Sequence, residues 1–329
     1  MFASRLLPLL FVLSLAACGD SAGPVVSTVA KPAAPATVAP AAPAPGKKIG
    51  LVMKTLTNPF FIEMEKGARR AEQELGVELQ VKTAAQETSI EQQIQIVEDM
   101  IAAKADAIVI APGDSQRLVP ALKKAVDAGI KVVNIDNRLD PEAIKQAGMA
   151  PVPFISVDNE KAAFASARFI ADTAVTPTQA AILEGIRSAD NARQRMEGAK
   201  RAFAGNAQVK LVASEAANWK IDEGFTVTKQ IFTKHPDVKL LFAANDMMAL
   251  GALKFLQETQ RADVKVAAYD ALDEAVAEVK AGRLAVTVNQ QAAEQGFQGV
   301  TLAMRLLKGE SVPEVTLIDT RLVTAADLK

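Results

Sequence analysis

The side chains that could do chemistry in this chain are mostly amides, carboxylates and guanidinium groups, joined by three aromatic residues, and they follow predicted strands. Such polar groups form hydrogen bonds of fixed geometry, often two to neighbouring hydroxyl groups. Aromatic faces cover the apolar C–H face of a sugar ring. The combination favours recognition of a neutral, polyhydroxylated molecule. The candidates are Asn58, Phe60, Phe61, Asp136, Asn137, Arg195, Trp219, Asn245, Asp270 and Gln290, with Lys54 on the strand before the first loop.

Motifs of catalytic and cofactor sites are absent from the sequence. It shows no Ser-His-Asp set, Cys-His pair or HExxH, and no glycine-rich phosphate loop. A single His and a single Cys exclude most His-based metal sites, Cys-rich metal sites and an intrachain disulfide. Asp136 and Asp270 could form an acid–base pair, but the sequence gives no sign that either carboxyl group is tuned for proton transfer. We expect no enzymatic activity, no cofactor and no metal.

Each candidate also has a structural alternative, because Asp and Asn after strands commonly cap helices or form turns. Asn245 and Asp246, before MMALGAL, are the clearest predicted caps. Asp114 and Ser115 are predicted caps too, and we leave them out of the site. Trp219 could be a core residue, but AANWKIDEG is otherwise polar, which favours a binding role.

The elements that position these residues alternate between short strands rich in Val and Ile and longer amphipathic helices. This order is typical of parallel sheets built from βαβ units. AIVIA and KVVNI are nearly continuous apolar runs, as expected when both sheet faces are covered. The alternation restarts at FISVD, so we predict an α/β fold of two doubly wound, Rossmann-like lobes. Ligands of such sheets bind beyond the carboxyl ends of the strands.

Bulk composition is ordinary for a globular protein of 329 residues, with 50% hydrophobic and 23% charged residues. The length suggests two domains or one large one. The formal net charge of −1 provides no overall cationic field that would attract nucleic acid or anionic lipid. We expect no nucleic-acid partner.

Residues 1–17 are predicted to be a signal peptide, with one Arg and an apolar run too short to span a bilayer comfortably. They end in LAAC, which resembles the lipobox of bacterial lipoproteins; that resemblance implies cleavage before Cys18 and acylation of this residue. The alternative is a soluble exported protein with a Cys near its cleavage site. Residues 18–46 are rich in Ala and Pro and are predicted to be a tether. We expect a folded body anchored on the periplasmic face of a bacterial membrane.

Five stretches, in this order and spacing, point to a known family: TLTNPFFIEMEKGARRAEQELG, VNIDN, ARQRMEGAKRAF, FAANDMMALGAL and VAAYDALDEAVAEVKAGRLAVTVNQ. Over nearly all of residues 48–310, the chain resembles the periplasmic substrate-binding proteins of sugar ABC transporters, specifically the ribose-binding-protein group of the type I fold. The resemblance implies a monomer that captures a monosaccharide or polyol and delivers it to a membrane permease. A sensor input protein with the same pocket remains an alternative. A transcriptional repressor core of the same fold would need an N-terminal DNA-binding module. An enzyme acting on sugars would need a set of catalytic residues.

The resemblance implies a role for each candidate in the first lobe. Asn58 donates to ligand hydroxyls, Phe60 and Phe61 sandwich one face of the sugar, and Asp136 accepts from ring hydroxyls. Two positions depart from the ribose-like pattern. Asn137 stands where that pattern has Arg, and Lys54 replaces a small polar residue, either reaching the pocket or lying in solvent. A different pentose or hexose, a polyol or a sugar acid therefore stays open.

In the second lobe, the resemblance implies that Arg195 supplies a guanidinium group and Trp219 stacks on the opposite sugar face. Asn245, Asp270 and Gln290 match the remaining polar ligands.

The resemblance also implies three strands that cross between the lobes and a hinge motion that closes them. The expected crossings lie near Ser156–Asp158, Ala285–Gln290 and Leu317–Thr320. This divides the chain into a first lobe of residues 48–156 plus 291–318 and a second lobe of residues 157–290 plus 319–329. The segment 139–154 is longer than in the ribose pattern and has no predicted role.

Overall fold

The computed structural model describes residues 46–328 of the chain. The predicted signal peptide of residues 1–17, Cys18 and all but the last residue of the tether lie outside the described residues. Within residues 46–328, no helix is long and apolar enough to cross a membrane.

The first of two six-stranded sheets is entirely parallel, with the order β11-β5-β4-β3-β1-β2. The strands at its centre are buried on both faces, which explains their continuous apolar sequences. The strands are β1 (Lys48–Met53), β2 (Glu78–Thr83), β3 (Ala107–Ile110), β4 (Lys131–Ile135), β5 (Phe154–Val157) and β11 (Val315–Ile318).

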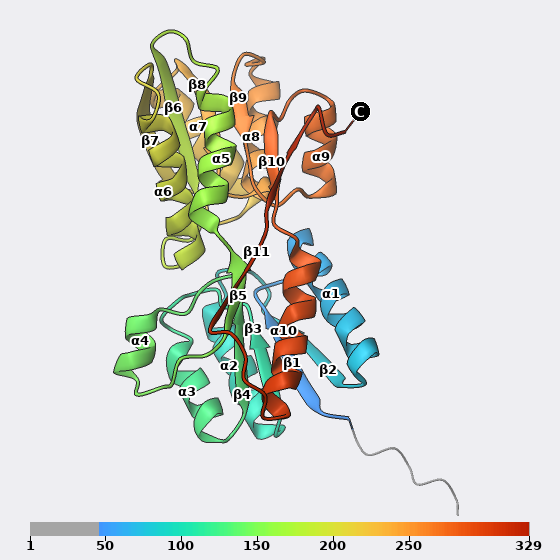
Figure 1. The fold of residues 1–329 in the computed structure, drawn as a ribbon. Coiled ribbons are helices and arrows are strands. Elements are labelled where there is room, and N and C mark those ends of the chain that lie inside the picture. Colours follow the sequence, from blue (N-terminus) through green and yellow to red (C-terminus); the bar gives the residue numbers. More distant parts are fainter. Residues whose placement is uncertain (1–45, 329) are drawn as a thin grey trace, which may run out of the picture. The chain divides into compact units, whose positions relative to one another are not determined.

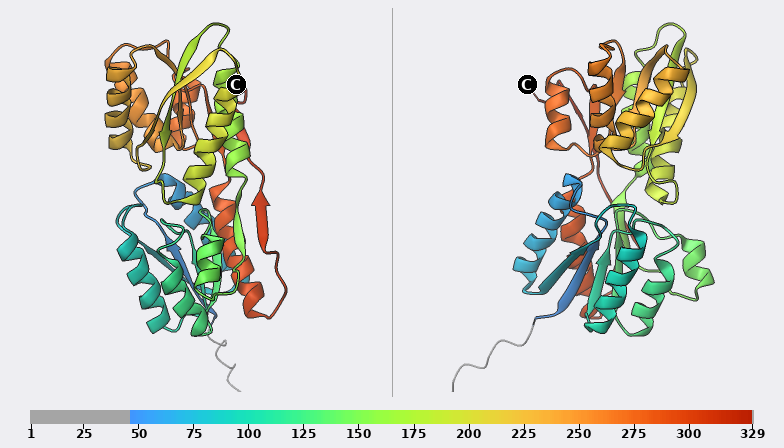
Figure 2. Two further views of the ribbon diagram at one scale, coloured as in Figure 1. Left: turned by 90° about the vertical axis from the view of Figure 1, so that its left-hand side faces the viewer. Right: turned by 180° about the vertical axis from the view of Figure 1, so that it is seen from behind.

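Helices cover both faces of this sheet (Figures 1 and 2). Alternate residues of β1 separate the two faces: Leu51 and Met53 pack in the core with α1 and α10, whereas Val52 packs with α2 and α3. The helices of this half are α1 (Pro59–Leu75), α2 (Ile90–Ala102), α3 (Val119–Asp127), α4 (Pro141–Gln146) and α10 (Ala292–Leu307).

The second sheet has the order β12-β10-β9-β8-β6-β7 and is parallel except for β12, which runs antiparallel to β10. Helix α5 packs on β8, β9, β10 and β12, and α6 packs on β6 and β7. Helices α7, α8 and α9 also contact strands of this sheet. The strands are β6 (Thr178–Glu184), β7 (Val209–Ala216), β8 (Val238–Ala243), β9 (Lys265–Ala267), β10 (Val286–Asn289) and β12 (Arg321–Thr324). The helices are α5 (Asn159–Ala171), α6 (Asp190–Ala204), α7 (Ile221–Lys234), α8 (Asp246–Glu258) and α9 (Asp273–Lys280). The predicted α/β fold with two doubly wound sheets is confirmed.

The chain passes between the sheets three times: after β5, after β10, and between β11 and β12. The last passage differs from the single crossing strand expected at Leu317–Thr320. β11 pairs with β5 in the first sheet, and β12 pairs with β10 in the second, so Asp319 and Thr320 fall between two ladders. We call the half built on the first sheet the N-terminal lobe and the half built on the second sheet the C-terminal lobe.

The predicted caps hold in part. Asn245 caps α8, since its side chain accepts from the Met248 N–H, but the Asp246 carboxylate does not cap this helix and instead accepts from the Leu272 N–H. Helix α3 begins at Val119, after a turn, and not directly after the predicted caps Asp114 and Ser115.

The Asp114 carboxylate holds that turn by accepting from the N–H groups of Gln116 and Arg117, as a cap would. The Ser115 hydroxyl caps nothing locally, because it accepts from Asp190 in the other lobe. The segment 139–154, which had no predicted role, contains α4, capped by the Asp140 side chain.

Helices α1 and α10 lie side by side (Figure 1) at a separation that only glycine permits. A Cβ atom at Gly67 would lie 1.7 Å from the Ala293 carbonyl oxygen, and one at Gly296 would lie 2.0 Å from the Met64 carbonyl oxygen. Both obstacles are backbone atoms, so no change of side-chain rotamer relieves the clash.

We predict that Gly67→Ala forces α1 and α10 apart and lowers the free energy of unfolding by about 1–3 kcal/mol. Urea denaturation followed by circular dichroism measures the change. Lys66→Ala, at the neighbouring exposed position, is the control and should unfold like the wild type. Equal midpoints for both variants would contradict the close helix contact.

Candidate ligand-binding site

The predicted residues converge on one cavity at the carboxyl ends of the strands of both sheets. The space between them amounts to about 230 Å³, part of it open to solvent. Ten of the eleven predicted residues line it, and two further residues, Glu87 and Asn191, were not predicted. The lining residues are Lys54, Asn58, Phe60, Phe61, Glu87, Asp136, Asn191, Arg195, Trp219, Asn245, Asp270 and Gln290.

The loop from β1 to α1 is fixed by Asn58. Its Oδ1 accepts from the Phe60 N–H at 3.0 Å and so caps α1, with Pro59 as the first helical residue. Its Nδ2 donates to Glu87 Oε1 at 2.9 Å. Since Nδ2 carries two hydrogens, one N–H of Asn58 remains for a ligand.

The three aromatic residues of the cavity wall are all buried. The Phe60 and Phe61 rings meet edge to face, with centroids 5.1 Å apart. Trp219 packs so closely on Gly185 that a Cβ atom there would lie 2.0 Å from the indole ring. The indole is therefore a packed residue and a cavity wall at once. Its Nε1–H has no hydrogen-bond partner among residues 46–328.

Lys54 reaches the cavity, which decides between the two alternatives for this residue. Its side chain is 3% exposed, and Nζ lies 2.7 Å from Asp136 Oδ2. This contact is an ion pair without hydrogen-bond alignment, because Oδ2 has no hydrogen-bond partner within the described part of the chain. Burial raises the pKa of Glu87, and the Lys54 charge and the Asn58 hydrogen bond oppose that shift.

Arg195 ties the C-terminal lobe together beneath the cavity. Its Nε donates to Asn159 Oδ1 at 2.8 Å, one terminal nitrogen donates to the Ala244 carbonyl at 2.9 Å, and the other donates to Gln290 Oε1 at 3.2 Å. The guanidinium carbon also lies 3.8 Å from the centroid of the Tyr269 ring. Every nitrogen of the side chain is thus held by the protein, which fixes its orientation without a ligand.

The pKa of Asp270 is raised, which corrects the expectation that neither Asp136 nor Asp270 has a shifted pKa. Burial raises its pKa to about 7, against the opposing effects of the Arg195 charge, 3.5 Å away, and of the hydrogen bond that Gln290 donates at 2.6 Å. Burial and the neighbouring Asp270 also raise the pKa of Asp246 well above its ordinary value. The Asp246 carboxylate accepts from the Leu272 N–H and from the Thr287 hydroxyl, whereas Asp270 accepts from Gln290 with one oxygen and lines the cavity.

Backbone strain gathers at the same strand ends. Asp136, Trp219 and Asp270 have φ angles of 61°, 67° and 126°, in a region that residues other than glycine rarely adopt. Such residues cost of order 1–3 kcal/mol each and cluster at functional sites. The strained backbone aims these three side chains at the cavity.

Asn137 is the one predicted residue that the structure does not bring to the cavity. It is fully buried behind Asp136, where Nδ2 donates to the Pro112 carbonyl at 2.9 Å and Oδ1 accepts from the Asn191 N–H at 3.2 Å. Its contacts join the lobes and do not reach the cavity.

The two missed residues left weak signals in the sequence. Glu87 follows β2, which ends at Thr83 and carries no predicted site residue beyond its end. Asn191 lies within the polar stretch that also contains Arg195.

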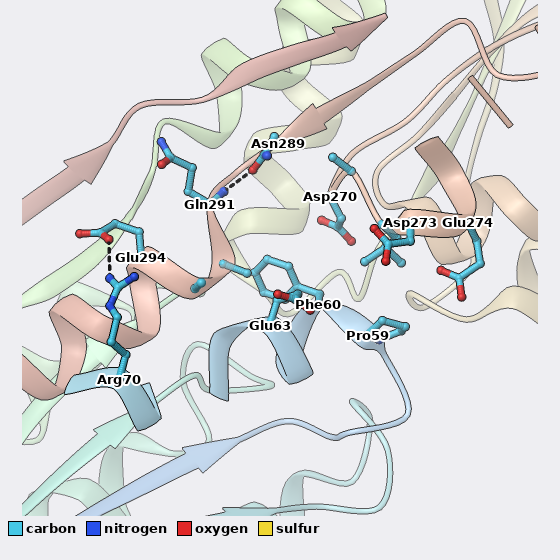
Figure 3. Close-up of a pocket in the computed structure, with 14 residues that line it drawn as sticks. Pro59, Phe60, Glu63, Arg70, Asp270, Asp273, Glu274, Asn289, Gln291 and Glu294 are labelled. Carbon is cyan, nitrogen blue, oxygen red and sulfur yellow. Dashed lines mark hydrogen bonds and ion pairs between the residues drawn. The ribbon is translucent and has the colours of Figure 1, made fainter. Parts of the chain in front are cut away.

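A larger, acidic hollow adjoins the cavity (Figure 3). It encloses about 1120 Å³, part of it open to solvent, and shares Phe60 and Asp270 with the cavity. Arg70 bonds to Glu294 on its wall. The aromatic residues Phe61 and Trp219 do not line this hollow, so the candidate ligand site is the smaller cavity.

Comparison with known proteins now identifies the family. The family model described as "Periplasmic binding protein domain" matches residues 49–311. The chain belongs to the periplasmic binding protein family.

The relatives of this periplasmic binding protein indicate to which group within the family it is most similar. The D-ribose/D-allose-binding protein of Pseudomonas aeruginosa is 42% identical over 267 residues, which cover 80% of this chain and 83% of the relative. The D-allose-binding periplasmic protein of Escherichia coli is 32% identical, covering 83% and 91%. Both relatives are named as sugar-binding proteins, and they confirm the predicted ribose-binding-protein-like group of periplasmic sugar-binding proteins.

Solved structures agree on the fold. A periplasmic solute-binding protein of an ABC transporter from Actinobacillus succinogenes, determined with bound D-allose, is 36% identical with a TM-score of 0.81, covering 85% of this chain and 98% of that one. A solute-binding protein from Agrobacterium vitis with bound D-fucose has a TM-score of 0.80 at 26% identity, covering 85% and 96%. The type I periplasmic binding protein fold is confirmed.

Asp270 should make the stability of this periplasmic binding protein depend on pH. Between the ordinary carboxyl pKa of 3.8 and about 7, the folded protein holds a proton on Asp270 that the unfolded chain has released. The free energy of unfolding therefore falls as pH rises through this window. We predict a loss of stability between pH 5 and pH 7.5 that is smaller in Asp270→Asn, measured by urea denaturation at both pH values.

The exposed variant Asp237→Asn is the matched control and should retain the wild-type loss. If Asp270→Asn lost as much stability over this range as the wild type, the carboxyl group would not be buried in the sugar-free protein.

Proposed function

We propose that this protein captures a neutral monosaccharide or polyol in the cavity and delivers it to the membrane permease of an ABC importer. The observation that carries the proposal is a set of buried polar atoms without hydrogen-bond partners among the described residues. Asp136 Oδ2, Asn191 Oδ1 and Trp219 Nε1 all belong to residues of the cavity wall. Asp136 Oδ2 has only its ion pair with Lys54, whereas leaving Asn191 Oδ1 and Trp219 Nε1 unpaired costs about 1–3 kcal/mol each. Hydroxyl groups of a bound sugar would satisfy all three atoms.

The hydroxyl group suits these atoms because it both donates and accepts. Two of the unpartnered atoms are oxygens that need a donor, and the third is an N–H that needs an acceptor. In the proposed complex, Asp136 and Asn191 accept from sugar hydroxyls and Trp219 donates to one. Phe60, Phe61 and the face of Trp219 cover the apolar parts of the ring.

Charge in and around the cavity favours a neutral ligand over a sugar acid. The buried carboxyl groups of Glu87, Asp136, Asp246 and Asp270 outnumber the buried cations of Lys54 and Arg195. Both cations already have protein partners, because Lys54 is paired with Asp136 and every nitrogen of Arg195 donates to the protein, so an additional carboxylate would meet no unengaged cation among the described residues. Among neutral sugars, D-ribose and D-allose are the first candidates, because relatives carry those sugars in their names.

Residues of both lobes form the cavity wall, and this arrangement supports a mechanism for delivering the ligand to the permease. We propose that residues 48–156 plus 291–318 and residues 157–290 plus 319–329 move as two bodies about the three passages between the sheets. A ligand that contacts Asp136 on one lobe and Arg195 on the other stabilises the closed state. The permease would recognise that state. A monomer, lipid-anchored through Cys18 on the periplasmic face of the membrane, completes the proposal.

Calorimetry against D-ribose, D-allose, other pentoses and hexoses, polyols and sugar acids tests the central claim. We predict binding of at least one neutral sugar or polyol and no binding of sugar acids. Asp136→Ala and Arg195→Ala should each weaken binding about 30-fold or more, because each leaves buried polar groups unpaired. Asp237→Ala, remote and exposed, should bind like the wild type. Absence of binding at millimolar sugar would refute the proposal, and unchanged affinity in both cavity variants would show that the site lies elsewhere.

Trp219 provides an independent optical test, because it is the only tryptophan of the chain. Its indole is 4% exposed and lines the cavity. We predict that saturating sugar changes the intensity or wavelength of tryptophan emission, and that Trp219→Phe removes this signal and weakens binding. Emission that stays constant while calorimetry detects binding would exclude Trp219 as a ligand contact.

A further inference from the structure

A second set of contacts joins the lobes beside the cavity. Helix α6 of the C-terminal lobe carries Asn191 and Arg195. Its N-cap residue is Ala189, whose methyl group cannot accept a hydrogen bond from the helix. The first N–H groups of a helix have no partner within the helix. The partners of α6 come from the N-terminal lobe.

Two side chains of the N-terminal lobe accept these hydrogen bonds. Ser115 Oγ accepts from the Asp190 N–H at 3.0 Å, and Asn137 Oδ1 accepts from the Asn191 N–H at 3.2 Å. A backbone bond beside them, from the Ser115 N–H to the Ser188 carbonyl at 3.2 Å, also crosses between the lobes. The helix is thus capped across the lobe boundary.

Both acceptors are held by hydrogen bonds within their own lobe. Asn137 Nδ2 donates to the Pro112 carbonyl at 2.9 Å and to Ser115 Oγ at 3.3 Å, both within the N-terminal lobe. The Ser115 carbonyl accepts from the Asp140 N–H at 2.8 Å. Because these bonds fix both side chains, closing the lobes does not require ordering them again.

We propose that Ser115 and Asn137 are positioning residues that cap α6 from the opposite lobe and thereby stabilise the closed state without touching the ligand. The cap also sets where α6 places Arg195 and Asn191. The affinity measurement below rests on the proposed sugar-binding function, whereas the closed state can be measured without sugar.

The expected size of the effect follows from helix capping. Removal of a capping hydroxyl corresponds to about a threefold to tenfold change in an equilibrium constant. When only the closed state binds the ligand, the affinity falls in proportion to the fraction of molecules that are closed. Ser115 and Asn137 do not line the cavity, so the loss should be the same for every sugar.

Ser115→Ala is the decisive variant, compared with Ser89→Ala as a matched control. Ser89 is also a serine before a helix, but its side chain makes no capping bond. Calorimetry with D-ribose and D-allose measures affinity, and small-angle X-ray scattering of the sugar-free proteins measures closure. We expect Ser115→Ala to bind both sugars about threefold to tenfold more weakly with their ratio unchanged, and to have a larger radius of gyration than the wild type and Ser89→Ala.

Unchanged affinity and unchanged scattering in Ser115→Ala would overturn the proposal. A changed ratio between the two sugars would overturn it as well, because Ser115 would then contact the ligand. If the wild type binds no sugar, the proposed function fails, and the scattering comparison still decides on the cap: equal radii of gyration for all three proteins would reject it.

Discussion

The structure of the site depends on the balance of charge among side chains that are buried from water. The carboxyl groups of Glu87, Asp136 and Asp270 line the cavity with the two cations Lys54 and Arg195, and the buried Asp246 neighbours Asp270. Buried charges are stable only when they are paired and hydrogen-bonded, or when they are neutralised by a proton. Lys54 accordingly lies against Asp136, Arg195 faces Asp270, and the pKa values of Glu87, Asp246 and Asp270 are raised.

The same balance explains why so much of the surrounding structure is devoted to holding side chains in place. All three side-chain nitrogens of Arg195 donate to protein acceptors. The side-chain oxygen of Asn58 accepts from the Phe60 N–H and so caps α1. Strained backbone at Asp136 and Asp270 directs the carboxyl groups into the cavity. A flexible side chain could move toward solvent to escape burial, so rigid support is what keeps the charges opposite one another.

The sequence predicted the fold and most of the cavity wall because both depend on local patterns. Apolar strands alternate with amphipathic helices, and polar or aromatic residues after parallel strands meet at one edge. Asn137 lies outside the cavity wall, where its amide bonds to the Pro112 carbonyl and the Asn191 N–H, and sequence spacing does not give these contacts. Glu87 depends on its partner Asn58, and Ser115 on Asp190 in the other lobe. Such contacts appear only once the chain is folded.

The split of the last crossing segment into β11 and β12 has a similar cause. The apolar residues around Leu317 fit a single strand, and nothing local marks the point where the ladder partner changes from β5 to β10. Only the positions of the two sheets decide that Asp319 and Thr320 lie outside both ladders.

The unpartnered atoms of the cavity wall also determine what the cavity can discriminate. A hydroxyl that donates to Asp136 Oδ2 adds to the ion pair which that atom already forms with Lys54. Hydroxyls that reach Asn191 Oδ1 and Trp219 Nε1 remove two unfavourable contributions. An analogue that lacks one of these hydroxyls leaves one group buried and unpaired, at a cost of about 1–3 kcal/mol, or roughly a factor of 5 to 150 in affinity. An extra methylene in an apolar pocket discriminates by a comparable amount only when it clashes or leaves a void. Selection by this protein therefore acts on the pattern of hydroxyl groups more than on the bulk of the ring, and the rigid support of the charged residues is what keeps that pattern fixed.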